Sequence, residues 1–154
     1  MPPNRRGRTV ERIFVNTQSH TEFVDLTREI KTLIARFSFK NGMVHLFVPH
    51  TTAAITVNEN SDPAVQYDML CALNAAVPWT QPHFRHAEGN SAAHVKASLM
   101  GCSAALFVEN GELMLGQWQG VFFCEFDGPR QRQVWARLEP SAMAASKFGK
   151  SNPI

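Results

Sequence analysis

Residues 83–101 read HFRHAEGNSAAHVKASLMG, and this stretch separates two parts of the chain that differ in character. It begins as a loop without periodic pattern and becomes a helix after Asn90, a residue type that caps free helix amides. Gly101 ends that helix, where a residue free to adopt positive φ is favoured. Helical and strand patterns alternate upstream of this stretch, whereas only short strands follow it. The sequence therefore predicts a single α+β domain.

The upstream part contains strand and helix patterns in alternation. Ile30, Leu33, Ile34 and Phe37 have the i, i+3, i+4, i+7 spacing of a core-facing helix, which Lys40-Asn41-Gly42 is expected to end. The run at 43–49 is apolar at nearly every position, so we expect a strand covered on both faces. The upstream elements predicted in this way are strands at 9–18, 22–24, 43–49 and 52–57, a helix starting near Asp25 or Thr27, and a helix at 63–77.

The downstream part is predicted to contain only strands. Asn110-Gly111 is among the best signals for a tight hairpin turn. The strands are expected at residues 104–108, 113–115, 118–125 and 131–138. This pattern predicts one domain over 8–138, a flexible lead-in at 1–7 and a mobile tail at 139–154.

The composition of the chain argues against two classes of binding partner, nucleic acids and membranes. The 154 residues carry 15 Lys and Arg against 13 Asp and Glu, a net charge of only +2, so nucleic acid is not an expected partner. No apolar run approaches the roughly 20 residues of a membrane span, and no signal peptide is evident, so we expect a cytoplasmic protein without a membrane partner. Cys71, Cys102 and Cys124 form no Cys-x-x-Cys pair, and we expect all three to be small buried residues.

Three histidines gather in the stretch at 83–101, and a fourth lies further upstream. His83 and His86 lie in the predicted loop and His94 in the predicted helix, while His50 separates two predicted strands. Imidazole is the commonest metal ligand, and catalytic zinc sites combine three protein ligands with an open position. His50, His86 and His94 are therefore candidate ligands of a divalent metal. The alternative is that they are ordinary core or surface histidines, since their spacing matches no known local zinc pattern.

The predicted helix start also favours an anion. The backbone amides after Asn90 lie at the positive end of the helix dipole, where phosphate groups bind. Gly89 and the small side chains of Ser91, Ala92 and Ala93 let a ligand approach the backbone. Asn90 and Ser91 are therefore candidate phosphate-binding residues. The alternative is that the small residues only allow close packing against a neighbouring element.

A second candidate cluster is the run EFDGPR at residues 125–130, which follows a predicted strand. Arg130 can grip a phosphate through its planar guanidinium, while Glu125 or Asp127 orients a histidine or a metal-bound water. Asp-Gly-Pro is also ordinary turn chemistry, and Arg130 can simply pair with Glu125 or Asp127. Both interpretations remain open from the sequence.

Further carboxylates follow the strand at 52–57. Asp62 precedes Pro63 and is expected to cap the next helix, and Asp68 on that helix is most simply a solvated residue. Glu59 comes directly after the apolar strand, so it is kept as a candidate acid or base.

Taken together, six blocks of the chain resemble the YjbQ family, whose members are commonly described as secondary thiamine-phosphate synthases. The blocks are HTTAA (50–54), NEN (58–60), FRH (84–86), NSAAHVK (90–96), GELMLGQWQ (111–119) and EFDGPR (125–130). Their order and spacing cover about residues 8–138, which makes the match highly specific. Phe84 stands where the family usually has tyrosine, and Gln117 where threonine is common. Neither departure removes a candidate ligand.

The resemblance implies a small α+β fold in which a mixed, barrel-like β-sheet carries two to three α-helices, assembled as a homotrimer. It implies a site that gathers the histidines matching His50, His86 and His94, with metal in some members. The activity assigned to the family is a weak condensation of a pyrimidine diphosphate with a thiazole phosphate to give thiamine phosphate.

We therefore expect an enzyme, similar to a thiamine-phosphate synthase, that acts on a phosphorylated or diphosphorylated metabolite with zinc or magnesium as cofactor. The metal and the helix dipole would offset charge on the leaving group. The alternatives are a non-catalytic trimer that binds a metal or a metabolite, and a metal-dependent phosphate hydrolase. The candidate residues are Glu59, Glu125 and Asp127 for catalysis or orientation, Asn90, Ser91 and Arg130 for phosphate, and His50, His86 and His94 for metal.

Overall fold

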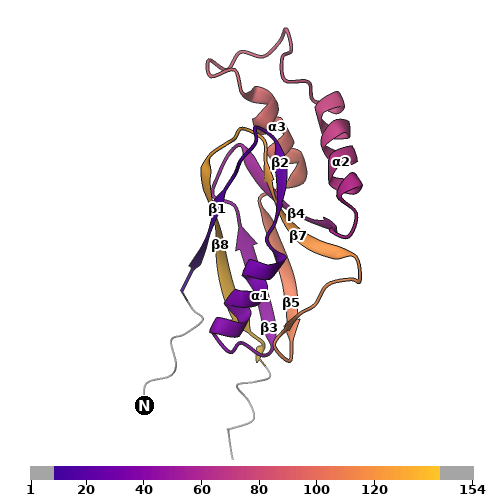
Figure 1. The fold of residues 1–154 in the computed structure, drawn as a ribbon. Helices are drawn as coiled ribbons and strands as arrows, with labels where there is room; N and C mark the ends of the chain where they lie inside the picture. Colours follow the sequence, from indigo (N-terminus) through magenta and orange to yellow (C-terminus); the bar gives the residue numbers. More distant parts are fainter. Residues whose placement is uncertain (1–8, 143–154) are drawn as a thin grey trace, which may run out of the picture.

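The computed structural model describes residues 9–142, and in that range it contains eight strands and three helices (Figure 1). Every strand and helix predicted from the sequence is present, with shifts of a few residues at the ends. No helix in this range is both long and apolar enough to cross a membrane. The elements are β1 (Glu11–Asn16), β2 (Glu22–Asp25), α1 (Thr27–Arg36), β3 (Gly42–Phe47), β4 (Ala53–Glu59), α2 (Pro63–Ala76), α3 (Ser91–Met100), β5 (Ser103–Glu109), β6 (Glu112–Leu113), β7 (Gln119–Glu125) and β8 (Gln131–Pro140).

The strands form two sheets, with the order β1-β8-β3-β5-β6 in the larger and β2-β7-β4 in the smaller. All strand pairs in the described residues run antiparallel, so the α+β class is confirmed but the expectation of a mixed sheet is wrong. Helical crossovers create parallel neighbours only when they return to the same sheet. Here α1 leads from β2 in the smaller sheet to β3 in the larger one, and α2 with α3 leads from β4 to β5.

The main core lies between α1 and the two sheets. Ile30, Leu33 and Ile34 are buried on one side of α1, as their spacing predicts. They pack in the same cluster as Val44 and Leu46 of β3. Full burial of such a side chain contributes about 1.5–3 kcal/mol relative to exposure, so this apolar stripe is sufficient to dock a short helix.

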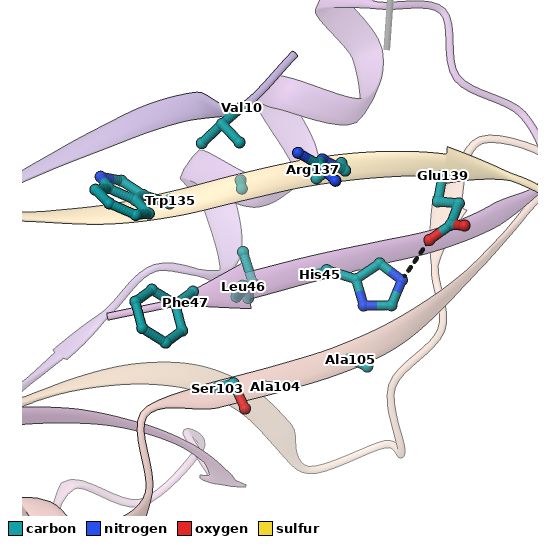
Figure 2. Close-up of a pocket in the computed structure, with 11 residues that line it drawn as sticks. Val10, His45, Leu46, Phe47, Ser103, Ala104, Ala105, Trp135, Arg137 and Glu139 are labelled. Carbon is teal, nitrogen blue, oxygen red and sulfur yellow. Dashed lines mark ion pairs between the residues drawn. The ribbon is translucent and has the colours of Figure 1, made fainter. Parts of the chain in front are cut away.

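The outer face of the larger sheet is open, and β3 is therefore not covered on both faces as expected. His45 and Phe47 alternate with the buried residues of β3 and line a surface pocket on this outer face (Figure 2). His45 Nε2 lies 3.0 Å from a carboxylate oxygen of Glu139, and the Phe47 ring lies 5.8 Å from the Trp135 ring. The expectation fails because only one face of this five-stranded sheet packs on the main core.

A second core lies between α3 and the smaller sheet. Ala93 and Ala97 of α3 pack with Ala54, Cys124 and Phe126. Small side chains let the helix approach the sheet closely, so the packing interpretation is correct for this part of α3.

α2 begins as predicted, because the side chain of Asp62 accepts a hydrogen bond from the amide of Ala64 at 2.9 Å. No residue of α2 is buried, however, and Cys71 on this helix is exposed. Cys102 is also exposed and only Cys124 is buried, so the expectation of three buried cysteines is wrong for two of them. The physical reason for Cys71 is that the described part of the chain covers no face of α2 completely.

The described part of the domain ends later than expected. Pro140 is the last residue of β8 and pairs with Gly42, so Glu139 and Pro140 belong to the sheet rather than to a tail. The predicted lead-in at 1–7 and the remainder of the predicted tail, 143–154, lie outside the described residues.

Candidate functional site

Glu125 ends β7, and its completely buried carboxylate is saturated with hydrogen bonds. Arg132 donates from Nη2 to Oε1 at 2.6 Å and from Nε to Oε2 at 2.8 Å. The amide of Asp127 donates to Oε1 at 2.9 Å, and Thr17 Oγ1 donates to Oε2 at 3.0 Å. Arg132 Nη2 also donates to Thr52 Oγ1 at 2.9 Å. These contacts tie β7, β8 and the loops beside β1 and β4 into one rigid support.

This environment decides the charge of Glu125. Burial raises the pKa of its carboxyl group, but the hydrogen bonds from Arg132, the Asp127 amide and Thr17, with the charge of Arg132, outweigh burial and leave the pKa below its ordinary value. An ionised carboxylate with both oxygens occupied has no free site for exchanging a proton with a substrate. Glu125, a candidate catalytic residue in the sequence, is thus an anchor for the turn that carries Asp127.

Asp127 gathers three side chains, two of which come from distant parts of the chain. Its Oδ2 accepts hydrogen bonds from Asn90 Nδ2 and from Arg130 Nη2, each at 2.9 Å. Its Oδ1 lies 3.7 Å from His20 Nε2. The side chain of Asp127 is 13% exposed and that of Arg130 53% exposed, so the guanidinium keeps a side open to solvent. Asp127, Asn90, Arg130 and His20 are named the Asp127 cluster.

His20 joins this cluster because the loop between β1 and β2 lies directly on the turn at 125–130. The amide of Gly128 donates a hydrogen bond to the carbonyl oxygen of His20 at 2.9 Å. A Cβ atom at position 128 would collide with the carbonyl oxygen of Ser19, so this close approach requires glycine.

Asn90 precedes α3 but does not cap it with its side chain. Its Nδ2 is turned instead toward Asp127 and toward Glu88 Oε2, which lies 3.4 Å away. Its Oδ1 is buried and has no hydrogen-bond partner among the described residues. The amides of Ala93 and His94 donate to the backbone carbonyl oxygen of Asn90 at 3.0 and 3.4 Å, so at the start of α3 the amides of Ser91 and Ala92 are left without an acceptor among the described residues. They lie at the positive end of the helix dipole.

His86 and His94 lie together beside this helix start. Their ring centroids are 5.3 Å apart, and the ring planes meet at 82° in an edge-to-face arrangement. His86 comes from the loop before α3 and His94 from the helix itself. His86 Nε2 lies 4.0 Å from a carboxylate oxygen of Glu88. The structure therefore brings together two of the three predicted histidines.

His50 is hydrogen-bonded to the larger sheet. Its Nε2 accepts a hydrogen bond from the backbone amide of Gln133 at 3.0 Å, and its ring lies edge-on to Phe123 at 6.5 Å. β3 ends at Phe47, which pairs with Trp135, so no carbonyl group of β3 reaches the amide of Gln133 further along β8. The imidazole of His50 takes the place of that carbonyl acceptor. Burial, followed by the charge of Arg132, lowers the pKa of His50 and favours the neutral ring. With Nε2 accepting a hydrogen bond, the ring proton belongs on Nδ1.

The predicted metal site is not assembled within one chain. Between residues 9 and 142, no group of three or more His, Cys, Asp or Glu side chains is arranged to hold a metal ion. His86 and His94 supply two imidazoles, whereas His50 is held elsewhere and has no free lone pair while its neutral ring accepts the Gln133 amide. The donor set of a single chain therefore does not fit a three-histidine metal centre.

Glu59 lies at the opposite end of its strand from the candidate site. It ends β4 opposite Gln119, whereas Ala53 at the beginning of β4 pairs with Glu125. A strand of this length separates Glu59 from Glu125 by about 20 Å. Its carboxylate accepts a hydrogen bond from Ser61 Oγ at 2.7 Å. This geometry places Glu59 outside the group formed by the other candidates.

Two buried cations, Arg132 and Lys96, were missed in the sequence. Their positions in the sequence pattern indicate burial for both. Arg132 is in register with the alternate, inward-facing residues of β8, and Lys96 has the helical spacing of the buried alanines of α3. No local signal identifies His20, since its approach to Asp127 depends on how the loop between β1 and β2 folds onto a turn more than a hundred residues away.

Residues 11–140 match the family model described as UPF0047 protein YjbQ-like. The chain belongs to the YjbQ family. Among YjbQ relatives, the UPF0047 protein YugU of Bacillus subtilis is 45% identical over 124 residues, which cover 80% of this chain and 94% of YugU. The UPF0047 protein MJ1081 of Methanocaldococcus jannaschii is 44% identical over 126 residues, which cover 80% of this chain and 89% of that relative.

Solved structures of YjbQ-like proteins share the fold. A crystal structure of an uncharacterised YjbQ/UPF0047 protein from Clostridium acetobutylicum matches with a TM-score of 0.81 and 44% identity, covering 84% of this chain and 99% of that chain. The conserved hypothetical protein TT1486 from Thermus thermophilus matches with a TM-score of 0.79 and 46% identity over 84% and 99%. These matches confirm the family suggested by the six sequence blocks and the single-domain α+β fold.

Proposed function

We propose that this YjbQ-family protein is an enzyme that acts on a phosphorylated or diphosphorylated small molecule where α3 meets the Asp127 cluster. The observation that carries the proposal is the start of α3, which Asn90 leaves without a side-chain cap while holding Asp127. This helix start lies beside the paired imidazoles of His86 and His94. An anion site and two proton-exchanging groups are thereby combined at one junction.

The phosphate is proposed to bind to the start of α3, at the free amide of Ser91, and to Arg130. A helix start attracts phosphate through its free amides and its dipole, and Ser91 adds a hydroxyl donor. Arg130 presents the N–H groups that do not contact Asp127, on a side chain that is 53% exposed. Asp127 has a positioning role here, because it fixes both Arg130 and Asn90.

The two histidines are proposed to exchange protons during transfer of a group from the phosphorylated substrate. In the condensation, one protonated imidazole donates a proton to the departing diphosphate oxygen as the thiazole nitrogen, which carries no proton, forms the new N–C bond. In hydrolysis, the other, neutral imidazole accepts a proton from the attacking water. The helix dipole offsets the negative charge on the leaving group.

The homotrimer, the divalent metal and the cytoplasmic location expected from the sequence are also proposals. Since residues 9–142 of one chain bring together only His86 and His94 of the three candidate ligands, a third ligand is proposed to come from another copy. The acid–base chemistry proposed here does not require a metal. Elemental analysis of the wild-type protein and of the His86→Ala variant tests the metal. Equal metal content in both proteins would remove His86 as a ligand.

The central test replaces His94 with alanine and uses His83→Ala as the matched control, since His83 is an exposed histidine of the loop that precedes α3. We expect His94→Ala to lower the condensation of a pyrimidine diphosphate with a thiazole phosphate by about a hundredfold or more, as loss of a proton-exchanging group does. The measurement is thiamine phosphate formation, together with the affinity for the diphosphate. His83→Ala should retain both.

Three results would contradict the proposal or redirect it. Unchanged turnover and affinity in His94→Ala would exclude the site. Binding of the diphosphate by the wild-type protein without any product would favour the non-catalytic binder. Release of free phosphate without condensation would favour the hydrolase.

A further inference from the structure

Lys96 is a lysine buried in the packed side of α3. It is 2% exposed and shares the buried stripe of this helix with Ala92, Ala93 and Ala97. Lysine is almost never fully buried unless its charge is paired, because the ammonium group loses its hydration. A position among alanines would tolerate an apolar residue, so the presence of lysine there calls for a charge-based explanation.

The recorded partner of Lys96 is an amide rather than a carboxylate. Its Nζ donates a hydrogen bond to Oδ1 of Asn74 on α2 at 2.5 Å. No ion pair in residues 9–142 includes Lys96. An ammonium group has three N–H donors, so the described residues leave part of its hydrogen-bonding capacity unused. Burial also lowers the pKa of Lys96, because the charged ammonium group is less stable away from water.

Lys96 lines a pocket of about 510 Å³ together with His20, Thr21, Asn74 and Trp79. The pocket lies where α2 and α3 face the loop between β1 and β2. The ring of Trp79 stands edge-to-face with the ring of His20, with 4.5 Å between the centroids, so part of the wall is aromatic. The volume falls within the range of about 300–1,000 Å³ that is usual for small-molecule sites.

The charge of the pocket favours an anion. No carboxylate of residues 9–142 lines it, and within that range the hydrogen-bond partner of Lys96 is a neutral amide. Asp127 contacts His20 at 3.7 Å but is not part of the lining. A bound anion would supply the countercharge that the described residues do not, and such a pair is strong because it forms away from bulk water.

We propose that this pocket binds the anionic group, a carboxylate or a phosphate, of a small molecule with a planar ring. Lys96 Nζ pairs with the anion, and the ring lies against Trp79. The lining of the pocket includes neither His86 nor His94, although it shares His20 with the Asp127 cluster, and its occupation does not require the enzymatic activity proposed above.

The test uses phenyl phosphate and benzoate as probes and the ¹H–¹⁵N resonance of the Trp79 indole as the readout. The Trp79→Phe variant identifies that resonance among the three tryptophans of the chain. We expect both probes to shift it saturably, whereas benzylamine, which carries the opposite charge, should not. Absence of a saturable shift with both anions would overturn the proposal. The shift should persist in Arg130→Ala, which separates this pocket from the phosphate site proposed at α3.

Lys96→Met provides the decisive variant, because it keeps the length of the side chain and removes its charge. We expect the affinity for both anions to fall about tenfold or more, which corresponds to about 1.4 kcal/mol. Lys31→Met is the matched control, since Lys31 is an exposed lysine on α1, and it should bind the probes normally. Equal affinity in Lys96→Met and the wild-type protein would overturn the role of Lys96.

Thermal unfolding distinguishes a ligand-binding lysine from a structural one. Lys96→Met should unfold at the same temperature as the wild-type protein or a higher one, because the cost of burying the ammonium group is removed. A marked loss of stability with unchanged probe affinity would show that Lys96 serves only its contact with Asn74. Trp79→Ala should weaken phenyl phosphate but not inorganic phosphate, and equal weakening of both would exclude stacking on this ring.

Discussion

Two acid–arginine pairs come from the same short segment of the chain, yet they have different surroundings. The side chains of Glu125 and Arg132 are 0% and 5% exposed, and those of Asp127 and Arg130 are 13% and 53% exposed. The buried arginine directs its donors at Glu125 and a threonine hydroxyl. Among the described residues, the side chain of the surface arginine donates hydrogen bonds only to Asp127, and it presents its remaining donors to solvent.

The difference shows that burial, more than residue type, separates an anchor from an arginine whose donors remain open to solvent. Two ions taken out of water depend on each other, so removing one leaves a costly unpaired charge. A half-exposed pair is hydrated and screened, and it contributes little to stability. Arg130 can therefore replace its contacts with water by contacts with a ligand. Arg132 cannot, because it is buried and its donors are directed at Glu125 and Thr52.

The largest effect is expected for Arg132→Met, which leaves Glu125 buried without its countercharge. We expect a loss of about 3–5 kcal/mol in the free energy of unfolding, measured by urea denaturation. The double variant Glu125→Leu/Arg132→Met should recover much of this loss, because neither charge remains. A loss below about 1 kcal/mol in Arg132→Met would contradict the anchor role.

A smaller effect is expected for His50, which borders the buried pair. His50→Phe leaves the amide of Gln133 without its acceptor, at a cost of about 1–3 kcal/mol. Because the pKa of His50 is lowered in the folded protein, the unfolded chain binds more protons just below pH 6.5, the ordinary value for histidine. The contribution of His50 to stability is therefore complete above that pH and is lost as the pH falls toward the lowered pKa.

Denaturation curves between about pH 5 and pH 7 test this contribution. The rise of stability with pH should be weaker in His50→Phe than in the wild-type protein. His45→Phe is the matched control, since His45 lies on the open outer face of the same strand region. An unchanged pH dependence in His50→Phe would contradict the role given to this ring.

The smallest effect on stability is expected for Arg130→Ala, which breaks the exposed pair. The free energy of unfolding should change by less than about 1 kcal/mol, while affinity for a phosphorylated ligand falls about tenfold or more. Calorimetric titration and urea denaturation of the same preparation measure both quantities. If Arg130→Ala destabilised the protein as much as Arg132→Met, the distinction between anchor and ligand-binding group would fail.

Local patterns predicted the elements well, because their causes act over a few residues. The stripe Ile30, Leu33 and Ile34 is buried on α1, and Asp62 caps α2, as the sequence indicates. Asn110 and Gly111 have φ angles of 52° and 86°, which the expected tight hairpin requires. The sheet that each strand joins was less predictable from the sequence, because it depends on pairing between strands far apart in the chain, which α1 and α3 connect.

By itself, the sequence determined the helices, the strands and the family, and it singled out His86, His94, Asn90, Asp127 and Arg130. Only the tertiary structure decided which groups meet. The sequence left Arg130 free to pair with Glu125 or Asp127, and the fold assigned Glu125 to Arg132 by burying both. It also brought His20 to Asp127 and enclosed Lys96 beside a pocket. The physical reason is that burial and charge pairing depend on segments far apart in the chain, whereas caps, turns and periodicity are properties of neighbouring residues.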